Sequence, residues 1–143
     1  MEIRDVLSPN HILLDFRAGD KGRLLRELSS LAATELGLDP DDVSAEIAKR
    51  EELGSTGVGN GVALPHARLN IKAPFALLAR LHQSIDFDAI DGKPVDIVVL
   101  LLLPEASNGA GALACVARAL RDAGVLRRLR DSSDSEALYH ALT

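Results

Sequence analysis

The sequence predicts an α/β fold in which helices flank a mixed β-sheet. Segments with apolar residues at helical spacing alternate along the chain with short runs rich in leucine and β-branched residues, a pattern typical of layered α/β proteins. The longest apolar run, residues 97–103, contains no polar residue, which favours a strand buried on both faces. Because the 143 residues contain no repeat or linker, we expect a single domain over residues 1–143.

The first half of the chain is expected to form one strand and two helices. Residues 12–16 are rich in β-forming side chains and are interpreted as the first strand. Asp20 is suited to cap the helix that follows, and Gly37 to end it. A second helix is expected to begin at Asp39-Pro40, because proline is favoured at the first helical position. This helix brings Arg50 to its C-terminal end.

The second half begins with two more predicted strands. The first covers residues 75–81, and the second covers residues 95–103. Between them, residues 91–94 contain glycine and proline and are interpreted as a turn. Pro104 is expected to end the buried strand.

The C-terminal part is expected to be helical. A helix with Leu113 and Leu120 on its apolar face follows the last strand. Gly124 is expected to separate it from residues 125–130, which are interpreted as a short helix or a helical turn. Ser133 and Glu136 have capping-box spacing, which predicts the start of the last helix.

Composition excludes several classes of protein. The net charge of −5 argues against a nucleic-acid backbone as the main partner. Cys115 is the only cysteine, so the chain has no internal disulfide and no cysteine zinc cluster. The longest apolar run is far shorter than the ~20 residues that span a bilayer, and no signal peptide is evident. We therefore expect a soluble, cytoplasmic protein without membrane insertion and without a metal or cofactor.

Residues 50–69 contain the features that predict chemistry. Four of the eight residues 54–61 are glycines, and glycine backbone can bring N–H groups close to an anion. Ser55 and Thr56 add hydroxyl donors. Pro65 restricts the backbone before His66, and Arg68 would share a face with His66 if the chain stays extended. These residues predict a phosphoryl site, with the backbone around Gly57 among its donors.

Histidine suits this chemistry because its neutral ring nitrogen is a nucleophile near neutral pH. Two simpler interpretations stand beside it: a histidine after proline often serves only as a loop or cap residue, and many glycine-rich loops are only turns. A nucleotide site is disfavoured, because Val62 interrupts the G-x-G-x-x-G pattern and no P-loop lysine is present.

Residues 50–66 resemble the active-site signature of the enzyme IIA domains of the bacterial phosphotransferase system, in the fructose/mannitol superfamily. The similarity is greatest to the nitrogen-type regulatory branch, and it extends through residues 87–96 and 127–130. The resemblance implies the layered fold of that superfamily and a phosphoryl group carried on His66. It also implies that Arg50 lies beside the histidine, although a solvated cation at a helix end is the alternative.

The resemblance also implies partners. An HPr-type phosphocarrier protein would donate the phosphoryl group, on Nε2 by analogy, and the phosphorylation state would control binding to downstream regulatory proteins. No metal or nucleotide is implied for this step. The chain would then be a histidine phosphoryl carrier rather than an enzyme acting on a small molecule.

The sequence departs from the family at one position of the site. Members usually carry a second active-site histidine at the start of the helix after the buried strand, but residues 105–112 contain none. Asn108 is a candidate substitute donor. Phosphorylation of His66 is still expected, with an altered rate or phosphohistidine lifetime. The alternative function is a regulatory binding module that acts by protein–protein interaction without efficient phosphotransfer.

Overall fold

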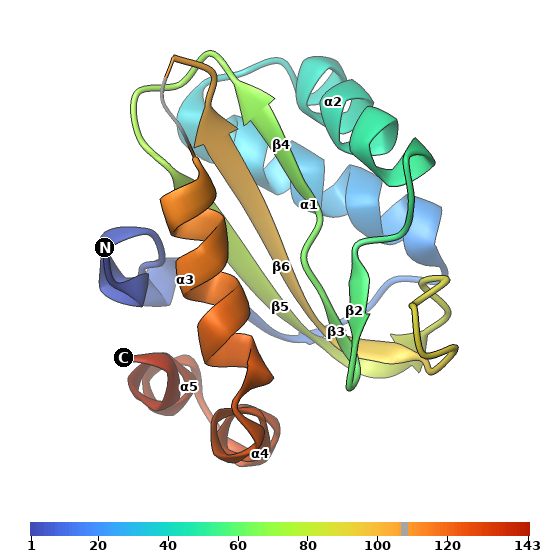
Figure 1. The fold of residues 1–143 in the computed structure, drawn as a ribbon, viewed down its shortest axis with the longest axis vertical. Helices are drawn as coiled ribbons and strands as arrows, with labels where there is room; N and C mark the ends of the chain where they lie inside the picture. Colours follow the sequence, from blue (N-terminus) through green and yellow to red (C-terminus); the bar gives the residue numbers. More distant parts are fainter. Residues whose placement is uncertain (107–108) are drawn as a thin grey trace.

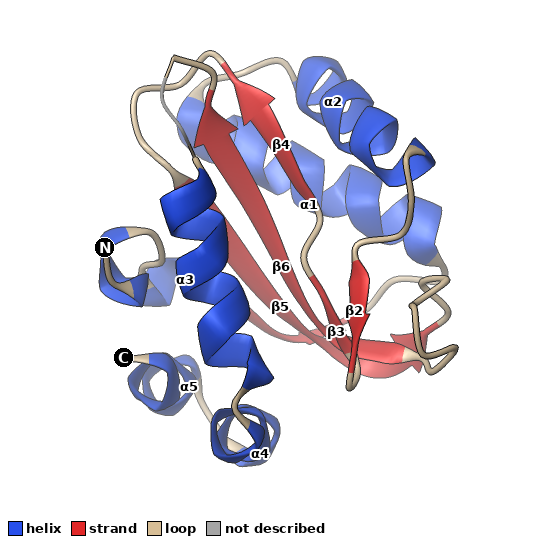
Figure 2. Cartoon of the chain, in the orientation of Figure 1, coloured by secondary structure: helices blue, strands red, loops and turns tan. Residues whose placement is uncertain are grey.

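The computed structural model describes residues 1–106 and 109–143, which are built around a six-stranded mixed sheet (Figures 1 and 2). The strand order is β1-β5-β6-β3-β2, and β4 also pairs with β6. β5 and β6 are antiparallel, whereas β1 pairs in parallel with β5, and β3 and β4 pair in parallel with β6. The expectation of a mixed sheet flanked by helices is therefore confirmed.

The bounds of the elements follow the chain. The strands are β1 (Ile12–Phe16), β2 (Gly57–Gly59), β3 (Val62–Ala63), β4 (His66–Leu69), β5 (Phe75–Ile85) and β6 (Val95–Pro104). The helices are α1 (Lys21–Leu36), α2 (Pro40–Glu52), α3 (Ala110–Arg121), α4 (Ala123–Asp131) and α5 (Ser135–Leu142). Two short 3₁₀ turns, Ile3–Asp5 and Pro9–His11, precede β1.

Strand β6 divides the core into two layers because successive side chains of a strand point to opposite faces. Val98, Leu100 and Leu102 pack with α1 and α2 in one cluster. Val99 and Leu101 pack in the other cluster, with α3, α4 and α5. Figure 1 shows α1 behind the sheet and α3 in front of it. The strand is thus buried on both faces, as its unbroken apolar run predicts.

The helix boundaries follow local capping chemistry. The Asp20 carboxylate accepts a hydrogen bond from the Arg23 N–H at 2.8 Å, and α1 ends at Gly37 in the left-handed conformation (φ 68°). Asp39 caps α2 in the same manner, with Pro40 at its first position. These predicted boundaries are correct.

Three predicted boundaries were wrong. Strand β5 continues through His82 to Ile85, because it pairs with β6 beyond a bulge. Asp122, rather than Gly124, separates α3 from α4, and its carboxylate caps the Gly124 N–H. Helix α5 is capped by Asp134 instead of Ser133, since the Asp134 carboxylate accepts from the Ala137 N–H. Pro104 is the last residue of β6.

The glycine-rich segment forms an antiparallel hairpin of β2 and β3 that the sequence pattern did not reveal. Its turn places Asn60 and Gly61 at positive φ, 58° and 79°. Asp91 accepts from the Asn60 N–H, and Arg130 from α4 donates to the Asn60 carbonyl at 2.6 Å. Arg130 also bonds both oxygens of Asp96, so the hairpin is anchored to α4 and to the start of β6.

Gly61→Ala is expected to destabilise the fold by about 2–3 kcal/mol, from backbone strain together with a steric clash. A Cβ at position 61 would lie 2.5 Å from Arg130 Nη2 and 2.7 Å from Asp96 Oδ1, so the ion pair must move. Gly37→Ala is the matched control, because Gly37 has similar φ and no atom within 4 Å of the added Cβ. It should cost only about 1 kcal/mol. Urea unfolding measures both, and equal losses would contradict the role assigned to the Arg130 clamp.

None of the helices described here is long and apolar enough to cross a bilayer.

Candidate functional site

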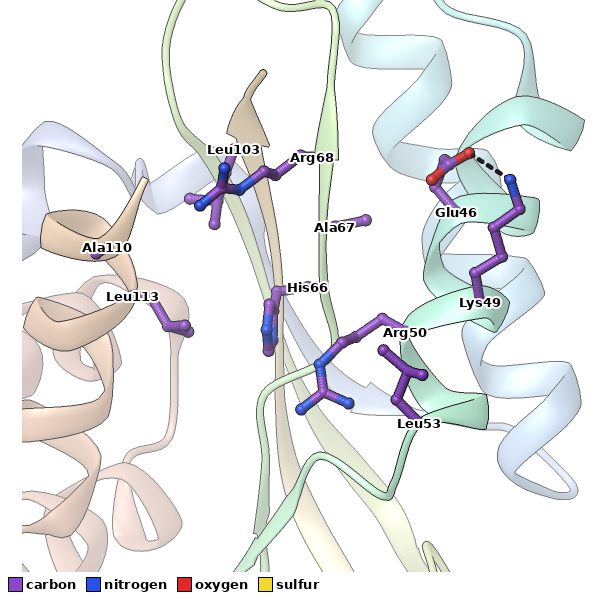
Figure 3. Close-up of a pocket in the computed structure, with 10 residues that line it drawn as sticks. All are labelled: Glu46, Lys49, Arg50, Leu53, His66, Ala67, Arg68, Leu103, Ala110 and Leu113. Carbon is purple, nitrogen blue, oxygen red and sulfur yellow. Dashed lines mark hydrogen bonds and ion pairs between the residues drawn. The ribbon is translucent and has the colours of Figure 1, made fainter. Parts of the chain in front are cut away.

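A cleft of about 380 Å³ opens between α2 and α3, above strand β4. Figure 3 shows His66 at its centre, with Arg50 from the last turn of α2, Leu53 from the residue after that helix, and Leu113 from α3. Arg68, from β4, lies at its upper end. The cleft therefore brings together three of the residues that the sequence singles out: Arg50, His66 and Arg68.

The alternation of β4 directs His66 into the cleft. Ala67 and Leu69 are buried and pack in the cluster under α1 and α2, so His66 and Arg68 take the opposite face. The strand is held by parallel pairing with β6, where His66 lies opposite Leu101. The shared face of His66 and Arg68 follows from the extended backbone of β4, as the spacing of the two residues predicts.

One ring nitrogen of His66 is committed to the backbone. Nδ1 lies 2.8 Å from the Leu64 carbonyl oxygen. Because a carbonyl oxygen can only accept, Nδ1 carries the hydrogen and donates it. In the neutral ring Nε2 is then the unprotonated nitrogen, with its lone pair available. The half-buried imidazole is thus fixed in both orientation and tautomer.

The cleft is electropositive on both sides of His66. The Arg50 guanidinium donates from Nη1 to the Gly54 carbonyl at 2.9 Å, and Figure 3 shows it reaching from the last turn of α2 toward the histidine. Arginine has five N–H donors, so this one bond leaves others for an anion. Arg68 is exposed and adds a second guanidinium. Lys49, the residue before Arg50, is paired with Glu46 at 3.1 Å.

Ser55, Thr56 and Gly57 lie outside the lining of this cleft, and their hydrogen bonds hold the loop to neighbouring parts of the chain. The Ser55 hydroxyl donates to the Phe87 carbonyl at 2.6 Å and accepts from the Gly57 N–H at 3.0 Å. The Thr56 hydroxyl donates to the Glu51 carboxylate. A Cβ at Gly57 would lie 2.8 Å from the Ala89 backbone, so glycine is needed there for close packing.

Comparison with known proteins identifies the family. Residues 5–143 match the family model described as "Phosphoenolpyruvate-dependent sugar phosphotransferase system, EIIA 2". The chain belongs to this family.

The relatives of this IIA protein place it in the nitrogen-type branch. It is 43% identical to a nitrogen regulatory protein of Bradyrhizobium diazoefficiens, over 99% of this chain and 95% of that protein. It is 38% identical to a nitrogen regulatory protein of Pseudomonas aeruginosa, over 97% of this chain and 93% of that protein. The crystal structure of nitrogen regulatory protein IIA-Ntr from Neisseria meningitidis superposes with a TM-score of 0.90 at 36% identity, covering 99% of each chain.

The fold is shared more widely. The crystal structure of IIA mannitol from Escherichia coli has a TM-score of 0.79 at 20% identity, covering 96% of this chain and 99% of that chain. The predicted family and its nitrogen-type branch are therefore confirmed.

The α3 wall of the IIA cleft is apolar in the part of the chain that the structure describes. Ala110 and Leu113 line it, at and just after residues 105–112, where the family resemblance predicts a second histidine. The sequence has no histidine between His82 and His140. Asn108, the candidate substitute donor, lies outside the described residues. Leu113 was expected only as a core residue, because helical periodicity does not show which end of an apolar face borders a cleft.

The remaining histidines of the IIA protein lie outside the cleft lining and have other partners. His11 packs on the Phe75 ring and pairs with Glu35 at 3.3 Å. The His82 ring hydrogen-bonds Asp15, which lowers the pKa of that carboxyl. Within residues 1–106 and 109–143, no three His, Cys, Asp or Glu side chains gather as a metal site would require.

Proposed function

We propose that this IIA protein is a phosphoryl carrier that accepts a phosphoryl group on His66 Nε2 from the phosphohistidine of an HPr-type phosphocarrier protein. One observation carries the proposal. The bond from Nδ1 to the Leu64 carbonyl leaves Nε2 free, inside a cleft flanked by Arg50 and Arg68. A nucleophile fixed in this manner beside two cations meets the requirements of phosphoryl transfer, which depends mostly on positioning and on stabilising the charge of the phosphoryl oxygens.

The step is a direct exchange of one P–N bond for another. The Nε2 lone pair of His66 forms a bond to phosphorus as the bond to the donor ring nitrogen breaks, and the electron pair of that bond returns to the donor. The acceptor ring then carries positive charge, and the Nδ1–H bond to the Leu64 carbonyl stabilises it. Arg50 and Arg68 neutralise the phosphoryl oxygens. The proposed contribution of Ser55, Thr56 and Gly57 is structural, because they hold in place the loop that follows α2.

The phosphorylated and unphosphorylated forms would differ by about two negative charges at one cleft. A charge change of this size can switch the affinity of a protein partner, so the proposal includes downstream regulatory proteins that distinguish the two forms. Such a carrier works in the cytoplasm, where phosphocarrier proteins reside.

The test is incubation of the purified protein with a phosphorylated HPr-type carrier, followed by intact-mass measurement. The expected result is a gain of one phosphoryl group that is lost in acid, as a phosphohistidine is. Two-dimensional ¹H–¹⁵N spectra of the imidazole should assign phosphorus to Nε2. The absence of any gain from a cognate donor, with the fold intact, would reject the carrier function. That result would favour the non-catalytic binding module, for which the apolar α3 wall is the supporting observation.

A further inference from the structure

A partly buried ion pair joins α1 to α2 and has no place in the proposed chemistry. Glu51 and Lys21 approach to 2.9 Å, and their side chains are only 8% and 21% exposed. Burying two charges is costly unless further hydrogen bonds satisfy them. A pair retained at that cost, one residue from Arg50, calls for a functional explanation.

Glu51 holds the far end of the loop that follows α2. Its two carboxylate oxygens each lie 3.3 Å from the Thr56 backbone nitrogen, and the Thr56 hydroxyl also donates to it. Thr56 itself is 3% exposed. Together with the Lys21 ammonium, these donors satisfy the partly buried carboxylate. The last turn of α2 and the residue before β2 are thus joined by one side chain.

Lys21 and Ser55 connect the same loop to the segment after β5. Both side chains donate to the Phe87 carbonyl, at 3.3 Å and 2.6 Å. The Lys21 ammonium also lies 4.6 Å from the centre of the Phe87 ring, and Phe87 is fully buried. The ion pair therefore sits at a junction of α1, α2 and two loops.

Arg50 depends on this junction through a backbone carbonyl. Its guanidinium is held by the Gly54 carbonyl, which lies in the loop between Glu51 and Thr56. Gly54 has φ 147°, a conformation that side chains rarely adopt, and it lies in a loop that is held at its two ends. Glu51 supplies one of those ends and Thr56 the other. Loosening this link would release the carbonyl that orients Arg50.

We propose that Glu51, held by Lys21, is a positioning residue that aims Arg50 at the phosphoryl group on His66. The inference rests on the proposed function of the cleft. Glu51 acts only through Arg50 and touches neither the phosphoryl group nor His66.

The test is a double-mutant cycle on the rate of phosphoryl transfer from a phosphorylated HPr-type carrier. Arg50→Ala should lower the rate on the order of 10²-fold, since it removes a donor to the developing charge. Glu51→Gln should lower it about 10-fold by misdirecting Arg50. In the Arg50→Ala protein, Glu51→Gln should change the rate less than about twofold, because no guanidinium remains to be aimed. Full additivity of the two effects would overturn the proposal.

A second measurement separates this inference from the carrier function itself. The Nη–H signal of Arg50, assigned by its loss in Arg50→Ala, should move to the position of a freely solvated arginine in Glu51→Gln, because the bond from Nη1 to the Gly54 carbonyl is lost. Lys21→Met removes the other member of the ion pair and should move the Arg50 signal in the same way. This variant replaces Glu51→Gln in the test if Glu51→Gln does not fold. An unmoved signal in either folded variant overturns the inference, even if the wild type proves to accept no phosphoryl group.

Glu52→Gln is the matched control. Glu52 is the next residue of α2 and is exposed, so the same change there removes a charge without touching the junction. Its rate and its Arg50 signal should both stay at wild-type values. A loss equal to that of Glu51→Gln would assign the effect to the net charge of α2 and overturn the positioning role.

Discussion

His66→Gln is expected to abolish phosphoryl transfer to this protein completely. Glutamine approximates the size of histidine but has no ring nitrogen that can form a stable P–N bond, so the acceptor is lost while the cleft keeps its shape. Since His66 is half-buried and the other cleft residues are unchanged, the free energy of unfolding should change by only about 1 kcal/mol. Intact mass after incubation with the phosphorylated donor measures the loss, and urea unfolding checks the fold.

The matched control is His140→Gln, at a histidine whose side chain is 75% exposed on α5. This variant should gain one phosphoryl group at the wild-type rate. Phosphorylation that persists in folded His66→Gln would show that another residue is the acceptor, and would refute the assignment of His66.

Leu100→Ala is expected to cause the largest loss of stability among the substitutions considered. Leu100 is fully buried at the centre of β6, opposite Leu77 on β5, in the core layer under α1 and α2. Truncation removes buried methyl groups and leaves a cavity that the closely packed sheet cannot refill. The expected cost is about 3–5 kcal/mol, measurable as a lower urea midpoint.

Leu53→Ala makes the same chemical change at a residue that is 84% exposed. It should alter the free energy of unfolding by only about 0.5 kcal/mol, because little apolar surface is returned to water. A comparable loss in both variants would mean that the central strand is not the main source of stability.

Local chemistry explains which parts of the fold could be predicted. The bounds of α1 depend on Asp20 and Gly37, and the start of α2 depends on Asp39 and Pro40, so neighbouring residues contain the signal. The β2–β3 hairpin was missed because strands of only two or three residues are too short to show a periodicity. The N-cap of α5 is Asp134 and not Ser133. Both residue types are good caps, so the local sequence does not decide between them.

In the candidate site, too, the local sequence predicts some features, and tertiary contacts determine the others. His66 and Arg68 share a face because two-residue alternation is a property of any strand, and Arg50 enters the cleft because α2 ends beside β4. The positions of Ser55 and Thr56 were not predictable, because their partners Phe87 and Glu51 are chosen by tertiary contacts. The apolar wall from α3 is likewise a tertiary feature.

The pairing of β6 with three other strands has a consequence for the order of events in folding. β3 and β4 are made early in the chain, yet their hydrogen bonds run to a strand that is synthesised much later. Parallel pairs between distant segments form slowly, because a long loop must close before any contact is gained. We expect His66 to reach its final geometry late, only after residues 95–104 have docked. A partially synthesised chain would therefore carry the complete motif while presenting no assembled cleft to a phosphorylated donor.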